Sequence, residues 1–273
     1  MRTRIAIACA LVTGLMGFSA QAHEPFQGLK QAVESDFRQA KNVERDVYRH
    51  PQATLEFLQV KATDTVIELW PGGGWYAEIL GPYLAKNGRY IAASFDTEPS
   101  EDNRRTRYRA KVGKKFEAWL EQNKAQFKGA AVTTFDPPSH LKLGDNGSAD
   151  VVLTFRNLHN WAMGGQLDAV FGSAYRVLKA GGTFGVIEHR ANPGMDSKTG
   201  YMDQQEMIDA AINAGFVLAE TSEVNANAKD MKAYPKGVWT LPPTLAMGEE
   251  DKAKYLAIGE SDRMTLKFVK PMK

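Results

Sequence analysis

Cysteine is almost absent from this sequence. Cys9 is the single cysteine among 273 residues, so no disulfide can form within the chain and a packed core must hold the fold. A surplus of one charge is also missing, because 34 lysines and arginines stand against 32 aspartates and glutamates. Without a basic excess there is no electrostatic case for binding nucleic acid or an anionic membrane. The 43% hydrophobic content excludes a disordered or collagen-like chain.

The first residues have the pattern of a secretory signal peptide. Arg2 and Arg4 precede an uncharged apolar run from Ile5 to Phe18, and Ala20-Gln21-Ala22 is a small-x-small cleavage pattern. We expect residues 1–22 to be removed after Ala22 and the chain to be exported to the periplasm or secreted. The apolar run is shorter than the roughly 20 residues of a membrane span, so no stable membrane anchor is expected.

Strand and helix patterns alternate along the rest of the chain. Residues 25–58 look helical, with Val43 on an apolar face and a break at Pro51. Seven strands are expected after that, at 65–70, 90–95, 131–135, 151–155, 183–187, 216–219 and 265–269. Helices are expected between them, at 75–80 (limited by Pro82), 101–127 (with Tyr108 on its apolar face), 166–178 and 203–215. Asp203 and Glu206 have capping-box spacing at the start of the last of these helices. Strands separated by helices predict a Rossmann-like, doubly wound α/β sheet.

No linker divides this pattern. We therefore expect one domain over residues 23–273, in which residues 23–60 form an N-terminal helical cap. The ligands of such a sheet bind beyond the carboxyl ends of its strands, so the residues that follow each strand are the candidates for a site.

The first predicted strand ends in three consecutive glycines. Gly72, Gly73 and Gly74 follow Glu68-Leu69-Trp70-Pro71 and lead into a helix, where glycines let a ligand approach the backbone closely. Gly72, Gly74 and Ala77 fit the G-x-G-x-x-A spacing of a dinucleotide site. A pyrophosphate needs N–H donors and no nearby anion, whereas Glu68 is an anion and Pro71 lacks an N–H. A sulfonium and an ammonium are favoured by a carboxylate, so S-adenosylmethionine (SAM) is the preferred ligand.

Residues Glu68 to Trp75 resemble motif I of the class I SAM-dependent methyltransferases, and the predicted elements fit that family in order over residues 25–270. The chain is similar to a group of exported bacterial proteins described as predicted methyltransferases. The segments that carry this likeness are Glu188–Ala191, Val238–Pro243, Gly259–Met264 and Phe268–Pro271. The resemblance implies that the last of seven strands is antiparallel. It also implies a SAM site at Glu68, Trp70, Gly72, Gly73 and Gly74.

The sequence departs from the family pattern at two places. Trp70 stands where motif I usually has its first glycine. The second strand should end in an acid that binds the ribose hydroxyls, but Ser94 stands there and Asp96 follows two residues later, so Asp96 is the candidate. Asp136, after the third strand, is the candidate for contact with adenine, and a plain turn residue before two prolines is the alternative.

Polar residues follow the fourth and fifth strands. Asn157 can bind the methionine part of the cofactor or a substrate, and His159 can accept a proton from a nucleophile, unless both belong to a structural hydrogen-bonded cluster. Glu188 and His189 end the fifth strand, where a carboxylate can orient a ring or raise its pKa. The predicted catalytic residues are therefore His159, His189 and Glu188. We expect no metal there, because adjacent strand residues point to opposite faces.

Two further groups carry charge. The basic run from Arg104 to Lys115 is interpreted as a solvated helix face. Arg49 and His50 lie in a segment that can cover the cofactor in class I enzymes, so they are candidates on the substrate side.

The function that these residues favour is SAM-dependent methyl transfer to a small-molecule acceptor, which the sequence does not identify, with His159 or His189 as the base. Two alternatives stay open. One is a non-catalytic exported binding protein on a methyltransferase scaffold, since SAM is made in the cytosol and the signal peptide sends the chain out. The other is a nucleotide-linked oxidoreductase, which rests on the G-x-G-x-x-A spacing alone. No nucleic-acid partner is expected, and the sequence does not indicate an oligomeric state.

Overall fold

The computed structural model describes residues 28–272. The predicted signal peptide and its cleavage point after Ala22 lie outside these described residues. Within residues 28–272, none of the helices has both the length and the apolar character that a membrane span requires.

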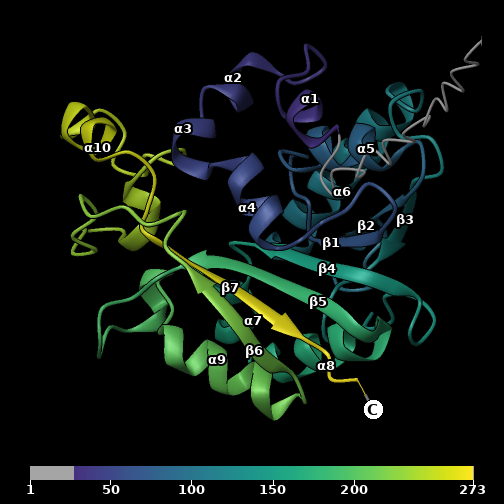
Figure 1. The fold of residues 1–273 in the computed structure, drawn as a ribbon. Helices are drawn as coiled ribbons and strands as arrows, with labels where there is room; N and C mark the ends of the chain where they lie inside the picture. Colours follow the sequence, from purple (N-terminus) through teal and green to yellow (C-terminus); the bar gives the residue numbers. More distant parts are fainter. Residues whose placement is uncertain (1–27, 273) are drawn as a thin grey trace, which may run out of the picture.

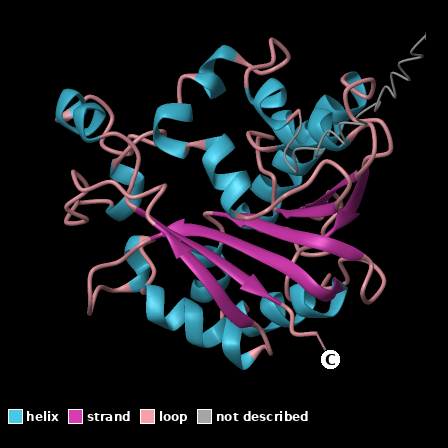
Figure 2. Cartoon of the chain, viewed as in Figure 1, coloured by secondary structure: helices cyan, strands magenta, loops and turns pink. Residues whose placement is uncertain are grey.

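A seven-stranded sheet runs through the molecule, and helices lie on both of its faces (Figure 1 and Figure 2). The strands are β1 (Thr65–Leu69), β2 (Arg89–Ser94), β3 (Ala131–Thr134), β4 (Ala149–Phe155), β5 (Leu178–His189), β6 (Val217–Ser222) and β7 (Arg263–Val269). Their spatial order is β3-β2-β1-β4-β5-β7-β6. The strands β1 to β5 pair in parallel, while β7 is antiparallel to both β5 and β6. The predicted doubly wound α/β sheet with an antiparallel last strand is therefore confirmed.

The helices pack against two separate cores. The helices are α1 (Leu29–Val33), α2 (Ala40–Val43), α3 (Asp46–Arg49), α4 (Pro51–Phe57), α5 (Ala77–Leu84), α6 (Arg104–Gln122), α7 (Leu158–Met163), α8 (Leu167–Val177), α9 (Gln204–Asn213) and α10 (Lys252–Ile258), with short 3-10 helices η1 (Ser197–Thr199) and η2 (Gly237–Thr240). Figure 1 shows α1, α4 and α5 on one side of the sheet and α8 and α9 on the other. Alternate strand residues serve the two sides, so Val66 and Leu153 join the first core while Ile67 and Val152 join the second.

The N-terminal cap differs from the prediction. The sequence predicts one helix up to Pro51, but the structure has three short helices, α1, α2 and α3, before it. The Ser35 hydroxyl accepts the Phe37 backbone N–H at 3.2 Å and so competes with helical pairing after α1. Val43, expected on a buried face, is 42% exposed. The helix expected after the break is confirmed as α4, with Pro51 in its first turn, where a missing N–H costs nothing.

Other helices also depart from their predicted limits. Pro82 lies inside α5 rather than at its end. Tyr108, expected on the buried face of α6, is 68% exposed. The helix α7 was not predicted, because its six residues are too few to show a helical period. One half of the expected capping box is present at the start of α9, since the Asp203 carboxylate accepts the backbone N–H groups of Gln205 and Glu206 at 2.8 and 3.1 Å.

The long connection between β6 and β7 is tied to the carboxyl edge of the sheet. Its Asp230 carboxylate accepts the Tyr201 hydroxyl at 3.0 Å and the Asp262 backbone N–H at 2.8 Å. The Asn227 side-chain amide donates to the Glu260 carbonyl at 2.7 Å. Because β7 runs antiparallel, its start lies at the edge where β4 and β5 end, so this connection helps to form the wall there.

Candidate functional site

A cavity of about 730 Å³ lies at the carboxyl ends of β1, β4 and β5. This edge of a parallel sheet is where ligands bind in folds of this kind. The walls come from the cap, the glycine turn after β1, the ends of β4 and β5, η2 and the start of β7. The predicted site residues that line it are Glu68, Trp70, Gly72, Gly73, Asn157, His159 and His189. The lining does not include Gly74, Asp96, Asp136 or Glu188.

Glu68 is a buried carboxylic acid at the end of β1, with 3% of its surface exposed. The Tyr90 hydroxyl donates to its Oε2 at 2.7 Å. Burial raises the pKa of Glu68 to about 7, although the Tyr90 hydrogen bond and the Arg156 charge oppose this shift. Near neutral pH, this side chain is therefore shared between the protonated acid and the carboxylate.

The glycine turn leaves open space where the cavity meets the backbone. A Cβ built on Gly72 or Gly73 would have no neighbour within 4 Å, and Gly72 has a φ of +58°. A Cβ on Gly74 would lie 3.2 Å from Trp119 Cζ3, so this third glycine permits close packing of α6 instead. Asn157 Nδ2 donates to the Leu69 carbonyl at 2.9 Å and so joins the end of β4 to the end of β1.

Trp70 fills the space between the ends of β2 and β3. Its ring centre lies 4.7 Å from that of Phe95, the residue after β2, and 4.7 Å from that of Trp161. Its Nε1 donates to the carbonyl of Phe135, the residue after β3, at 2.7 Å. The backbone of Trp70 has a φ of +49°, a left-handed conformation that glycine adopts more readily. The side chain that replaces the usual first glycine thus occupies the region where the family resemblance implies the adenine.

The two predicted nucleotide acids are engaged elsewhere. Arg109 Nη1 donates to Asp136 Oδ1 at 2.9 Å, and Asp96 Oδ1 accepts the Glu98 backbone N–H at 2.9 Å. Burial raises the pKa of Asp136, and the Arg109 charge opposes the shift. Neither Asp96 nor Asp136 lines the cavity, whereas Trp70, which contacts the residue before each of them, does. Arg109 belongs to the basic run, but it packs on Trp70 rather than facing water.

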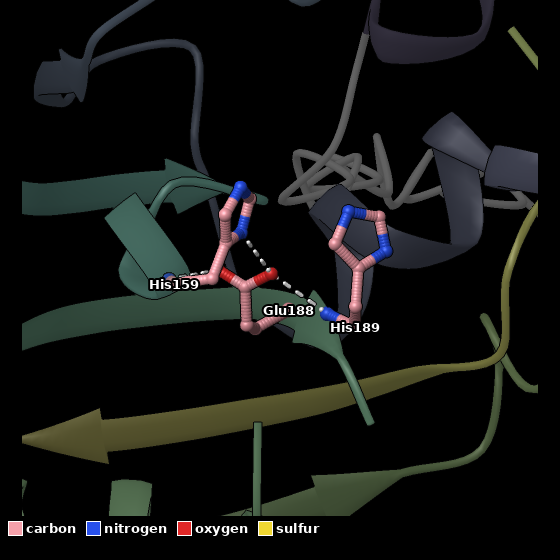
Figure 3. Close-up of side chains that lie close together, drawn as sticks. All are labelled: His159, Glu188 and His189. Atoms are coloured by element: carbon pink, nitrogen blue, oxygen red, sulfur yellow. Dashed lines mark hydrogen bonds and ion pairs between the residues drawn. The ribbon is translucent and has the colours of Figure 1, made fainter. Parts of the chain in front are cut away.

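Glu188 orients the segment that carries His159 (Figure 3). Its fully buried carboxylate accepts the Leu158 backbone N–H at 2.5 Å and the His189 backbone N–H at 2.8 Å. It also pairs with His159 Nδ1 at 3.1 Å, and His159 Nε2 lies 3.0 Å from Asn160 Nδ2. With Nδ1–H donating to Glu188 and Nε2 accepting from Asn160, both nitrogens of His159 are used.

His189 presents its ring to the cavity from the end of β5. Its Nδ1 lies 2.5 Å from Ser261 Oγ, and its ring centre is 5.5 Å from that of His159. Burial lowers the pKa of His189 well below its usual value, and the charges of His159 and Arg263 add to this. The ring is therefore neutral at pH 7.

One ligand atom each from His159, Glu188 and His189 lies within 4.8 Å of the other two. The expectation that strand alternation keeps Glu188 and His189 apart is therefore wrong. The Glu188 side chain turns back to its own backbone neighbour, and this brings its carboxylate between the two histidines (Figure 3). Its oxygens already accept several N–H groups, which an ion at this place would have to displace.

A cluster of arginines that the sequence analysis largely missed lines the same cavity around one carboxylate. The arginine cluster consists of Arg45, Arg49, Arg156 and Arg263, and its carboxylate is Glu260. Burial alone would raise the pKa of Glu260, but the four guanidinium charges outweigh it and lower the pKa to about 2. Arg49 was a candidate from the sequence. His50, its neighbour, does not line the cavity.

Comparison with known proteins places the fold but not the family. No family model matches the chain, and no curated protein matches its sequence. A SAM-dependent methyltransferase from Aquifex aeolicus is similar in structure with a TM-score of 0.53 and 14% identity, over 91% of this chain and 99% of that one. A SAM-dependent methyltransferase from Methanosarcina mazei has a TM-score of 0.51 and 11% identity, over 78% and 95% of the two chains.

The chain has the class I methyltransferase fold. A third similar structure is the (4+2)-cyclase SpnF, with a TM-score of 0.57 and 15% identity over 88% of this chain and 86% of that one. This protein is named as a cyclase and not as a methyltransferase. At these identities the likeness extends to the architecture, and the chemistry has to be argued from the cavity itself.

Proposed function

We propose that this protein is a SAM-dependent methyltransferase that acts on a small molecule in the cavity at the carboxyl ends of β1, β4 and β5. The observation that carries the proposal is the convergence of three features on one volume. They are the acid Glu68, the accessible glycine turn at Gly72 and Gly73, and the neutral ring of His189. The fold of the methyltransferases named above supports it.

The methionine part of SAM suits this cavity. A volume of about 730 Å³ lies within the range of small-molecule sites, roughly 300–1,000 Å³. The Glu68 carboxylate suits an ammonium or a sulfonium, and the open backbone at Gly72 and Gly73 permits close approach. The adenine does not fit between β2 and β3 while Trp70 is there, so it has to lie on the aromatic wall formed by Tyr76 and Phe155 or displace the indole.

When bound, SAM supplies a methyl group on a positively charged sulfur, and the protein has to align an acceptor with it and exclude water. His189 is the residue that can take a proton from that acceptor. In the tautomer in which Nδ1 donates to Ser261 Oγ, Nε2 is bare, and the lowered pKa keeps it so at neutral pH. His159 is a positioning residue in this scheme, because Glu188 and Asn160 hold both of its nitrogens.

A second candidate function is a non-catalytic, exported binding protein on the methyltransferase scaffold. It is favoured by Trp70, whose buried ring already occupies the region expected for adenine. Export to the periplasm, or secretion, belongs to this proposal and rests on the signal-peptide pattern of residues 1–22. The same segment requires the first candidate to obtain SAM outside the cytosol.

Calorimetric titration with S-adenosylhomocysteine separates the two candidates, because this product analogue needs no acceptor. We expect micromolar binding that weakens at least tenfold in Glu68→Gln and is unchanged in Glu117→Gln, a control on α6 outside the cavity. Absence of binding at millimolar ligand, by protein whose circular dichroism shows it folded, would exclude the methyltransferase proposal and leave the binding protein.

A further inference from the structure

The arginine cluster carries more positive charge than its single carboxylate can balance. Arg45 Nε lies 2.6 Å from Glu260 Oε1, and Arg49 Nε lies 2.9 Å from Oε2. Arg263 also pairs with Oε2, and Arg156 Nη1 lies 3.7 Å from it, too far for a hydrogen bond. Four guanidinium groups around one carboxylate leave a formal excess of three positive charges at one end of the cavity.

Several donors of this cluster are buried without a partner. Among the described residues, Nη1 and Nη2 of Arg49 and Nη2 of Arg45 have no hydrogen-bond partner. Arg49 is only 2% exposed, and its guanidinium carbon lies 4.7 Å from the centre of the Trp75 ring. Buried donors without partners are rare in folded proteins, because each costs the free energy of its lost hydration. A buried cation in this state beside a cavity calls for an anionic ligand.

Other charges near the cluster also favour an anionic ligand. Lys41 also lines the cavity and adds a positive charge, while burial raises the pKa of Glu68 to about 7, so this acid opposes the cluster less than an ionised carboxylate would. Burial lowers the pKa of Arg49 well below its usual value, and the nearby Arg156 charge adds to this. The repulsion among these guanidinium groups is electrostatically unfavourable, and an anion bound beside them would offset it.

We propose that the arginine cluster binds an oxyanion, a carboxylate or a phosphate group, of the molecule that accepts the methyl group. Arg156 and Arg263 lie where β4 ends and β7 starts and Arg45 and Arg49 lie on the cap, whereas Glu68 and the glycine turn lie at the end of β1. The acceptor assignment rests on the proposed function, but the oxyanion site does not. An anionic acceptor is also complementary in charge to a sulfonium.

Arg156 is the residue on which the test depends. It makes the longest ion pair of the cluster, its side chain is 22% exposed, and its backbone has a φ of +62°. Arg45, Arg49 and Arg263 also tie the cap to β7 through Glu260, so their loss would disturb the fold itself. Arg156→Gln removes a charge from the cavity and leaves those hydrogen bonds in place.

The first experiment measures the melting temperature of the full protein in inorganic phosphate and in acetate, against chloride at equal ionic strength. We expect both oxyanions to raise Tm with concentration, as specific binding to the native state requires. The apparent phosphate affinity should fall at least tenfold in Arg156→Gln and stay unchanged in Arg107→Gln, an exposed arginine of α6 outside the cavity. No shift beyond chloride in the unaltered protein overturns the proposal, whatever the variants do.

The second experiment identifies whether the cluster binds the acceptor or the cofactor. Phosphate is titrated with and without saturating S-adenosylhomocysteine, and then with methylthioadenosine, which lacks the amino-acid part. Unchanged phosphate affinity supports a site for the acceptor. Competition by S-adenosylhomocysteine but not by methylthioadenosine would overturn the acceptor assignment and give the cluster to the cofactor's own carboxylate. If S-adenosylhomocysteine fails to bind while phosphate binds, the methyltransferase proposal fails and the oxyanion site stands.

Discussion

The Arg109 guanidinium carbon lies 4.4 Å from the centre of the Trp70 ring and covers the indole on its α6 side. The same arginine is paired with Asp136 at 2.9 Å. Cation–π and ion-pair contacts therefore hold together an aromatic ring, a cation and an acid between the ends of β2 and β3. The Trp70 ring therefore already occupies the place that the base of a bound nucleotide would take.

Replacing Trp70 by glycine tests this relationship. Trp70→Gly restores the usual first glycine of the motif, relieves the left-handed backbone and empties the space between Phe95 and Phe135. We expect S-adenosylhomocysteine to bind at least tenfold more tightly in calorimetric titration. The protein should be about 3–5 kcal/mol less stable to urea, because a buried aromatic ring is lost. Trp119→Phe, in a ring outside the cavity lining, is the control. Unchanged affinity in folded Trp70→Gly would show that the indole does not block the adenine.

The raised pKa of Glu68 predicts how stability depends on pH. Its folded pKa of about 7 exceeds the ordinary glutamate value of 4.5, so between these pH values the native state binds a proton that the unfolded state has lost. This group's stabilising contribution is full at low pH and is lost as pH rises from 4.5 to 7. Glu68→Gln lacks this dependence. We expect the free energy of unfolding in urea, taken as the variant minus the unaltered protein, to rise by up to about 3 kcal/mol between pH 5 and pH 8. Parallel curves for the two proteins would contradict a pKa near 7.

Removing the carboxylate of the arginine cluster should be costly. Glu260→Gln leaves four guanidinium groups without a counter-charge, and breaking a buried ion pair on one side costs about 3–5 kcal/mol. Denaturation in urea measures the loss, and phosphate should restore more stability to Glu260→Gln than to the unaltered protein. Glu223→Gln, at the exposed ion pair with Arg190, is the control and should cost little. A mild effect of Glu260→Gln would mean that water already screens the cluster.

The charge state of His189 is accessible to nitrogen NMR. Burial, His159 and the nearby arginines lower its pKa well below the usual value, so its ring shifts should stay those of neutral imidazole from pH 8 down to pH 6. Arg156 is one of those arginines, so Arg156→Gln should raise the pKa of His189 while leaving the ring in place. Titration of His189 near its ordinary value in the unaltered protein would remove the support for its role as the base.

Most of the sheet was predictable because its central strands β1, β2 and β4 contain short apolar runs, whereas β5 begins five residues before its predicted start, at Leu178. Val66 and Ile67 show how the period of two assigns neighbours to opposite cores. The broken cap was less predictable, since the Ser35 hydroxyl accepts the Phe37 backbone N–H and so competes with helical pairing, which apolar spacing does not reveal. The same limit applies to α7, whose first backbone N–H, that of Leu158, donates to Glu188 on a strand thirty residues away in sequence.

The candidate site was predictable where it follows a local motif and not where it depends on distant pairs. Glu68 and the glycine turn came from eight consecutive residues. Glu260 and Arg49 are 211 positions apart, and no pattern in either segment indicates that they meet. The direction of the Trp70 side chain was also beyond sequence reasoning, because it is set by the backbone conformation of one residue, by the rings of Phe95 and Trp161 and by the Phe135 carbonyl.

Glu260 accepts hydrogen bonds from Arg45 and Arg49, and Arg263 donates to the Tyr48 carbonyl. The helix α3 and the start of β7, which lie on two sides of the cavity, are therefore connected directly. Amide protons of α3 should therefore exchange with solvent at the rate of the first residues of β7, and not at the faster rate of a separate flap. An oxyanion that binds the unpartnered donors of Arg45 and Arg49 would strengthen this connection and slow the exchange further.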